Sequence, residues 1–250
     1  ATNDAGVGML HALGAGLLDA DGRPLAPRPD QLDRLAAIDA SALAPLLGGA
    51  TIRVACDVTN PLTGPNGATA VFGPQKGATA DLVPRLERAL ERVARVSGHR
   101  DQADAPGSGA AGGLGFALRA FLGAELEPGV ELVARQIALP ETVRGADLVL
   151  TGEGTVDAQT PAGKTPAGVA RIAASAGVDC VVLAGRVGPG AERLLRCGAT
   201  EIIGIGPPDE PLARALRRGP DNLRRAVGQY LRRRRTDPRP PAGPARLTRW

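Results

Sequence analysis

Apolar residues recur at helical or strand spacing in several stretches of the chain. From Leu82 to Val96 they return every three or four positions, which predicts an amphipathic helix that Asp81 caps and Gly98 ends. Residues 51–57 alternate apolar and polar side chains, as a half-buried strand does. Weaker apolar patterns predict further helices over residues 9–13, 30–47 and 114–122.

Predicted strands and helices alternate in the second half of the chain. Short apolar runs predict strands over residues 147–151, 180–184 and 201–205, and helical spacing predicts helices over residues 165–176, 191–197 and 212–231. Strands and helices that alternate in this way form βαβ units around a parallel sheet. The sequence therefore predicts an α/β fold. Residues 232–250 are rich in Arg and Pro without an apolar period, so we expect them to be disordered.

The composition excludes several classes of protein. A chain of 250 residues with 43% hydrophobic and 22% charged side chains is typical of a globular protein. Aromatic residues make up 2%, which argues against a stacking surface for single-stranded nucleic acid. None of the three cysteines lies in a CxxC pair, and no apolar run approaches the roughly 20 residues of a membrane span. We therefore expect a soluble, cytoplasmic protein.

Positive charge is concentrated at the C-terminus. Residues 213–250 carry a net charge of +10 and the remaining residues carry −6, within a total of +4. A nucleic-acid-binding fold would carry its positive charge on the folded surface, so this distribution argues against a nucleic-acid partner. The run Arg232–Arg235 indicates a solvated terminal face, and a nonspecific, salt-sensitive contact with an acidic partner stays open.

Two Gly-rich segments lie in the first half of the chain. Residues 60–78 form a polar loop, and residues 107–115 contain the pattern G-x-G-x-x-G from Gly107 to Gly112. This pattern indicates a dinucleotide site only when a strand leads into it, and the residues before it are polar and end in Pro106. Two interpretations remain: a nest of backbone N–H groups for an anion, or a flexible loop tip.

A third Gly-rich segment, residues 151–165, combines carboxylates, hydroxyls and a lysine. It is not a Walker A motif, because Ala158 occupies the position of the required first glycine. Glu153 and Asp157 nevertheless follow a predicted parallel strand, where α/β sheets build their sites, and Lys164 lies at a predicted helix start. A carboxylate can hold Mg²⁺ or accept a proton while a lysine stabilises phosphate charge. Alternatively, the carboxylates cap turns and the lysine lies in solvent.

Lysine is rare in this chain, which makes its positions informative. Of 30 basic residues only Lys76 and Lys164 are lysines, and both lie in Gly-rich segments. Arginine and lysine are not interchangeable where a compact ammonium approaches a phosphate. The two lysines are therefore candidate contacts for an anion.

These segments resemble the bacterial class I glycerate kinase family. The resemblance extends in order from residue 1 to about residue 230. It rests on these motifs: Ala1-Thr2-Asn3-Asp4, Asp57-Val58-Thr59-Asn60-Pro61-Leu62, Gly64-Pro65-Asn66-Gly67-Ala68, Phe72-Gly73-Pro74-Gln75-Lys76-Gly77-Ala78, Gly109-Ala110-Ala111-Gly112-Gly113-Leu114-Gly115-Phe116, and Thr151-Gly152-Glu153-Gly154 with Asp157, Gln159-Thr160 and Gly163-Lys164.

The resemblance implies two α/β domains and a kinase activity. Residues 1–145 would form a domain inserted into a flavodoxin- or Rossmann-like parallel-sheet domain, of which residues 146–236 are the C-terminal half. Residues 237–250 lie outside the family pattern and would form a disordered, basic, Pro-rich tail. The implied reaction is ATP-dependent phosphorylation of D-glycerate with Mg²⁺, giving mainly 2-phosphoglycerate. The implied partners are glycerate and ATP, without a membrane, and a homodimer is compatible with the sequence.

The resemblance also assigns roles to residues. Asp157 would be the base or a magnesium ligand, Glu153 a magnesium ligand, and Lys164 a phosphate or carboxylate contact, which together make the catalytic set. The other implied site residues are Asn3, Asp4, Asp57, Asn60, Asn66, Gln75 and Lys76 for the substrate, and Gly109, Gly112, Gly113, Gly152, Gly154 and Gly163 for the nucleotide.

The sequence departs from the family pattern at two places. Family members carry about 110–120 further residues before Ala1, so half of the outer sheet would be absent and a strand edge exposed. Thr59 stands where many relatives carry an acidic residue, which weakens a metal role for that turn. The alternative hypothesis is therefore a truncated, inactive chain that binds a ligand or partner without turnover.

Overall fold

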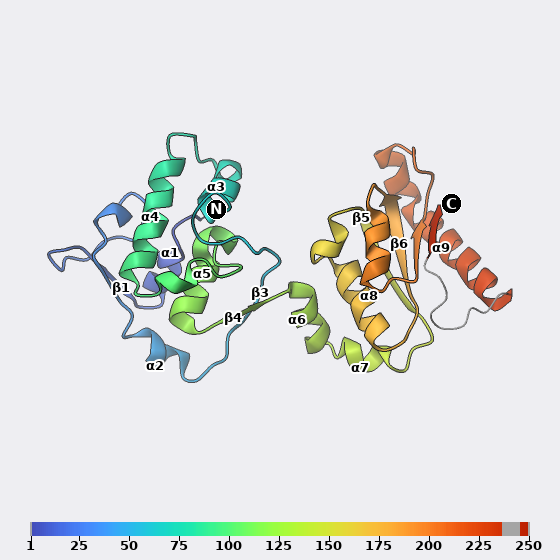
Figure 1. Cartoon of the computed structure of the whole chain (residues 1–250), viewed down its shortest axis with the longest axis horizontal. Helices are drawn as coiled ribbons and strands as arrows, with labels where there is room; N and C mark the ends of the chain where they lie inside the picture. The colour runs from blue at the N-terminus through green and yellow to red at the C-terminus, as the bar shows by residue number, and fades with distance from the viewer. Residues whose placement is uncertain (1, 237–245, 250) are drawn as a thin grey trace. The chain divides into compact units, whose positions relative to one another are not determined.

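The computed structural model, which describes residues 2–236 and 246–249, divides into two units (Figure 1). Unit 1 is Ala1–Pro128 and unit 2 is Gly129–Trp250. The sequence placed the domain boundary after residue 145, whereas residues 129–145 contribute to unit 2 as helices α6 (Gly129–Gln136) and α7 (Leu139–Val143). Both helices pack on α8 (Thr165–Ser175), where Gly168 leaves room for Val130 of α6.

Unit 1 combines helices with two short pairs of strands. Strand β1 (Gly16–Leu18) pairs antiparallel with β2 (Ala37–Asp39), and β3 (Arg53–Ala55) pairs parallel with β4 (Glu125–Glu127). The α-helices of this unit are α1 (Val7–Ala12), α2 (Leu43–Leu47), α3 (Ala68–Phe72), α4 (Val83–Val96) and α5 (Ala110–Leu122).

The core of unit 1 forms where α4 and α5 bury their apolar faces. Leu90 and Val93 of α4 and Phe116 of α5 are fully buried in one cluster. The predicted spacing of α4 is confirmed, because its Leu and Val positions face this core while most of its charged residues are exposed. The predicted cap is wrong: the N-cap residue is Leu82, without a side-chain hydrogen bond, and Pro84 lies in the first turn.

The helix predicted over residues 30–47 does not form. This stretch instead contains a 3₁₀ turn (Leu32–Arg34), strand β2 and the short helix α2. Pairing with β1 extends residues 37–39, and the Asp39 carboxylate accepts the Ser41 N–H at 3.0 Å, which starts a new turn. Tertiary pairing therefore overrides a weak helical pattern.

Unit 2 is built on a parallel sheet with the strand order β5-β6-β7-β8. Strands β5 (Val149–Val156), β6 (Cys180–Val187), β7 (Glu201–Gly204) and β8 (Arg246–Arg249) are all parallel to their neighbours. Helix α8 connects β5 to β6, a 3₁₀ segment (Ala191–Cys197) connects β6 to β7, and α9 (Leu212–Thr236) follows β7. The expected α/β class with parallel sheets is confirmed.

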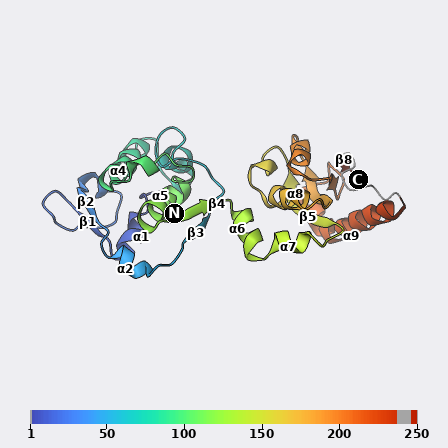
Figure 2. The same cartoon turned by 60° about the horizontal axis from the view of Figure 1, so that its bottom comes forward.

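Helices cover both faces of this sheet, as Figures 1 and 2 show. On one face Val182 and Ile202 pack with Ala170 of α8. On the other face Val181 and Ile203 pack with α9. Because β6 and β7 are buried on both faces, each contains a continuous apolar run in the sequence, residues 180–184 in β6 and residues 202–203 in β7.

The structure of unit 2 differs from the sequence prediction in two segments. Strand β5 extends to Val156, so the Gly-rich residues 151–156 lie in the sheet and not in a loop. Residues 246–249, placed in a disordered tail, form strand β8 beside β7. The expected disorder of residues 237–245 and Trp250 falls outside the described residues.

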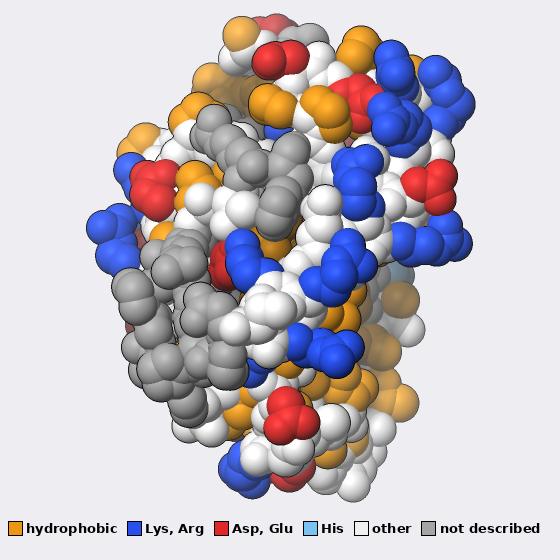
Figure 3. Space-filling model, turned by 90° about the vertical axis from the view of Figure 1, so that its right-hand side faces the viewer, with side chains coloured by type: hydrophobic (Ala, Val, Ile, Leu, Met, Phe, Trp, Pro, Cys, Tyr) orange, Lys and Arg blue, Asp and Glu red, His pale blue; other side chains and the backbone are white. Residues whose placement is uncertain are grey.

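The arginine run at the end of α9 is part of the structure and not simply a solvated face. Arg233 donates to both carboxylate oxygens of the buried Glu201 at 2.6 and 2.7 Å, and Arg234 donates to Asp179 at 2.8 Å. Other arginines of α9 are exposed, and Figure 3 shows basic side chains spread over this face of unit 2.

No helix in the described part of the chain is long and apolar enough to cross a membrane.

Candidate functional site

A buried aspartate fixes the loop before α1. Asp4 is 8% exposed, and its carboxylate accepts hydrogen bonds from the N–H groups of Gly6 and Gly8, both at 3.0 Å, and from the Thr2 hydroxyl at 2.8 Å. These amides begin a helix and lack partners within it. The carboxylate of Asp4, an expected substrate residue, is therefore engaged by its own loop.

Two further expected substrate residues contact the same loop. Asn3 Nδ2 donates to Thr69 Oγ1 of α3 at 2.9 Å, and Lys76 Nζ donates to the carbonyl oxygen of Thr2 at 2.8 Å. Burial lowers the pKa of the Lys76 ammonium, and the charge of Asp4 raises it in part. The structure thus brings Asn3, Asp4 and Lys76 together.

Two other expected substrate residues are joined by the turn over residues 60–67. Asn60 Nδ2 donates to the backbone oxygen of Asn66 at 2.8 Å. The backbone oxygen of Asn60 accepts the Gly109 N–H at 2.9 Å, so this amide is used inside the protein. The remaining two expected substrate residues, Asp57 and Gln75, are exposed.

The start of α5 winds in the left-handed direction. Ala111, Gly112 and Gly113 have φ values of 50°, 73° and 94°. A Cβ on Gly112 would overlap the carbonyl oxygen of Thr2, and one on Gly113 would lie 2.5 Å from the Cα of Ala5. This close approach of two backbone segments explains why glycine is needed at these positions. The contact of Gly109, Gly112 and Gly113 with a nucleotide stays a prediction.

In unit 2, Asp157 and Lys164 come together across one loop. Lys164 Nζ lies 3.9 Å from Asp157 Oδ1. The same carboxylate oxygen accepts the Gln159 N–H at 2.9 Å, and the Asp157 N–H donates to Thr160 Oγ1 at 3.0 Å. Lys164 is the residue before α8, so the ammonium lies at the start of this helix. A carboxylate and an ammonium in this arrangement can bind a hydroxyl and a phosphate oxygen.

Sequence reasoning gave no role to two residues that support this loop. Thr160 is fully buried beneath it, and Arg171 of α8 donates to the carbonyl oxygen of Pro161 at 2.9 Å. The sequence indicated Thr160 only as one member of a motif, without a role of its own. The role of Arg171 could not be predicted from a local pattern, because it depends on α8 folding back beside the loop.

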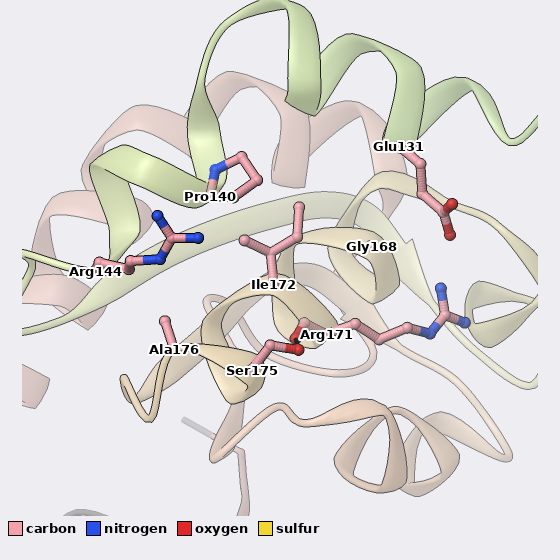
Figure 4. A pocket seen from close by; sticks show the side chains of 8 residues that line it. All are labelled: Glu131, Pro140, Arg144, Gly168, Arg171, Ile172, Ser175 and Ala176. Atoms are coloured by element: carbon pink, nitrogen blue, oxygen red, sulfur yellow. Dashed lines mark hydrogen bonds between the residues drawn. The ribbon is translucent and has the colours of Figure 1, made fainter.

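Arg171 also lines a small cavity between α6, α7 and α8. Figure 4 shows Arg171 and Glu131 at one end of it and Arg144 at the other. The cavity has a volume of about 310 Å³. None of the expected site residues lines this cavity.

Glu153 lies within β5 and not in a loop. It pairs with Ala184 of β6, whose side chain is buried in the core beneath α8, so the Glu153 side chain projects from the same face of the sheet. Gly152, Glu153 and Gly154 also line a cavity of about 760 Å³. Gly163 has a φ of 119° just before Lys164, a conformation that favours glycine.

Magnesium fits unit 2 only in combination with oxygens of a ligand. Within residues 2–236 and 246–249, no group of three or more His, Cys, Asp or Glu side chains could hold a metal ion. Mg²⁺ usually binds one or two protein carboxylates together with substrate phosphates. The expected magnesium ligands Asp157 and Glu153 would therefore need phosphate oxygens of a bound nucleotide to complete a site.

Replacing Gly112 by alanine tests the close packing in unit 1. We expect Gly112→Ala to lower the free energy of unfolding by about 2–5 kcal/mol, because it combines left-handed strain with overlap against Thr2. Urea unfolding followed by circular dichroism measures this loss. The control is Gly123→Ala, where φ is 63° but a Cβ meets nothing within 4 Å, so only the strain of about 1–2 kcal/mol is expected. Equal losses in the two variants would show that the overlap does not matter.

Comparison with known proteins assigns the chain to a family. The model of the glycerate kinase family matches residues 1–234. The chain is 42% identical over 230 residues to a glycerate kinase of Bacillus subtilis (strain 168) and 43% identical over 229 residues to a glycerate 2-kinase of Escherichia coli (strain K12). These matches cover 91% and 90% of the chain, respectively.

A solved structure agrees with this assignment. A crystal structure of a glycerate kinase 2 from Salmonella typhimurium LT2 is similar, with a TM-score of 0.77 and 42% identity. The similarity covers 94% of the chain and 63% of that structure, and the matches cover 60% of the curated relatives. The chain therefore spans less than two thirds of the length of these proteins. The chain belongs to the glycerate kinase family.

Proposed function

We propose that this chain carries the residues with which a kinase transfers the γ-phosphoryl group of ATP to D-glycerate, forming mainly 2-phosphoglycerate. The observation that carries the proposal is the 3.9 Å approach of Lys164 to Asp157, after a parallel strand and at the start of α8. Relatives named glycerate kinase and glycerate 2-kinase support the same acceptor. The chemistry of the two units fits the two substrates.

Unit 1 provides groups that suit glycerate. The acceptor carries a carboxylate and two hydroxyls, which require a cation and hydrogen-bonding amides. Burial lowers the pKa of the Lys76 ammonium and the charge of Asp4 raises it only in part, so an anionic ligand would stabilise the ammonium further. The side-chain amides of Asn3 and Asn60 are fixed by hydrogen bonds at 2.9 and 2.8 Å and can meet the hydroxyls.

Unit 2 provides groups that suit the reacting phosphate. A hydroxyl oxygen of glycerate attacks the γ-phosphorus, the bond from this phosphorus to the β–γ bridging oxygen breaks, and ADP leaves with the electron pair. Asp157 accepts the proton of the hydroxyl, and Lys164 holds a phosphate oxygen. Phosphoryl transfer depends chiefly on positioning and on neutralisation of charge, which this pair supplies.

Magnesium supplies further neutralisation of the phosphates when it is bound. The Glu153 and Asp157 carboxylates would hold it. Backbone groups of Gly152, Gly154 and Gly163 allow the nucleotide to approach, since a Cβ is absent at each. Mg²⁺, ATP and the glycine contacts all belong to the proposal.

The alternative hypothesis, an inactive chain that binds ligand without turnover, is not favoured. The relatives that carry a functional name are named kinases. The two hypotheses differ in a single observable, the release of ADP.

The proposal is tested by glycerate-dependent ADP release and by one carboxylate. With MgATP and D-glycerate the chain should release ADP, and enolase should convert the product directly, because enolase accepts 2-phosphoglycerate. Asp157→Asn should lower kcat by about 10²–10⁴-fold, because an amide cannot accept the proton. A coupled assay for ADP measures both effects.

The matched control is Asp221→Asn, an exposed aspartate of the same unit, which should keep the parental rate. A parental chain that releases no ADP with D-glycerate would contradict the proposed function. An Asp157→Asn variant at the parental rate would remove Asp157 from the reaction and leave the remaining assignment in place.

Lys76 should set the alkaline limit of the reaction. Because burial lowers the pKa of Lys76, the ammonium needed for the glycerate carboxylate is lost below the ordinary value of 10.5. We expect kcat/KM for glycerate to fall on the alkaline side with an apparent pKa below 10.5, and Lys76→Arg to move this limb to higher pH. A limb that is unchanged by Lys76→Arg would show that another group titrates.

A further inference from the structure

One partly buried carboxylate of unit 1 has no part in the chemistry proposed above. Glu87 lies on α4, and its Oε1 accepts the N–H of Gly64. Its Oε2 is buried without a hydrogen-bond partner among the described residues. Burial raises the pKa of this carboxyl, while the Gly64 amide and the Thr69 hydroxyl lower it. A buried carboxylate is costly, so its surroundings must explain it.

The first neighbour of Glu87 begins the turn that carries two proposed substrate residues. Gly64 has a φ of 91°, and its carbonyl oxygen accepts the Gly67 N–H at 2.8 Å. At the other side of this turn, Asn60 Nδ2 binds the backbone oxygen of Asn66 at 2.8 Å. The turn is thus held by Glu87 at its start and by the Asn60 amide near its end.

The second neighbour of Glu87 holds another proposed substrate residue. Thr69 is fully buried on α3, and its Oγ1 accepts the Asn3 Nδ2–H at 2.9 Å. The Thr69 hydroxyl also lies close to the carboxyl of Glu87 and lowers its pKa. One carboxylate therefore lies behind both Asn3 and the Asn60–Asn66 turn.

We propose that Glu87 is a positioning residue that fixes Asn3, through Thr69, and the Asn60–Asn66 turn, through Gly64, in the arrangement that binds glycerate. This inference rests on the proposed function and adds a residue that does not touch the substrate. It predicts that a change at Glu87 alters KM for glycerate, because Glu87 supports the residues proposed to bind glycerate. It predicts no change in KM for ATP, because the proposed ATP contacts lie on unit 2.

A carboxylate suits this place better than an amide of the same shape. The Gly64 N–H donates to Glu87, the nearby Thr69 hydroxyl can donate as well, and an ionised carboxylate only accepts. Glutamine has a single acceptor oxygen and no charge. Glu87→Gln therefore keeps the volume and removes both the charge and one of the two acceptor oxygens that hold these groups.

The experiment compares the steady-state kinetics of the parental chain, Glu87→Gln and Glu91→Gln. Glu91 is exposed one turn further along α4 and serves as the control. We expect Glu87→Gln to raise KM for D-glycerate about tenfold, with KM for ATP changed less than about twofold, and Glu91→Gln to change neither. Thermal melts of all three proteins confirm that they are folded.

If Glu87→Gln does not fold, variants of Thr69 test the inference through KM for glycerate. Thr69→Ser keeps the hydroxyl and should keep KM for glycerate, whereas Thr69→Val keeps the shape and should raise it as Glu87→Gln does. An unchanged KM for glycerate in Glu87→Gln, or in Thr69→Val where Glu87→Gln does not fold, would overturn the inference, and so would a parallel rise of both KM values. In either case an active parental chain leaves the proposed function standing. A parental chain that does not phosphorylate glycerate contradicts the proposed function itself.

Discussion

The candidate substrate side of this protein depends on backbone segments that approach closer than any side chain permits. Gly112 and Gly113 lie against residues 2–5, and the Gly109 backbone lies against Pro61. Three consecutive residues adopt left-handed φ values to make this fit. A left-handed residue with a side chain costs about 1–2 kcal/mol, so the glycines reduce the cost of the turn. The short loops that carry the polar side chains are then held by backbone contacts and not by long elements.

The close backbone packing decides which polar groups of unit 1 bond within the protein and which can meet a ligand. The carboxylate of Asp4 already accepts hydrogen bonds from amides of its own loop. The groups that can meet a ligand are therefore the Lys76 ammonium and the side-chain amides of Asn3 and Asn60. In the arrangement that we propose, Glu87 supports the amides from behind, with one carboxylate oxygen buried. In unit 2 the loop that carries Asp157 and Lys164 is supported by the buried hydroxyl of Thr160 and by helix α8, which starts after the lysine. Fixed groups of this kind lose little freedom when they bind.

Periodicity located the elements that bury a continuous face, such as α4, α8, β6 and β7, because their cores lie within one unit. It failed for residues 30–47, where strand pairing decides the structure, and for Glu153, because a stretch of Gly and Thr becomes a strand only through β6. Motifs found the polar residues that the fold gathers in unit 1. Glu87 was missed because it is one of many charged positions on an amphipathic helix, and its partners are brought to it by tertiary packing. Arg233 was assigned to solvent because its partner Glu201 lies far away in the sequence.

The most direct test of this account is a crystal structure of the chain with D-glycerate bound. The account predicts the glycerate carboxylate within hydrogen-bond distance of Lys76 Nζ and its hydroxyls beside the amides of Asn3 and Asn60, with the backbone of residues 109–113 unchanged. Glycerate bound without contact to any of these three side chains would contradict it.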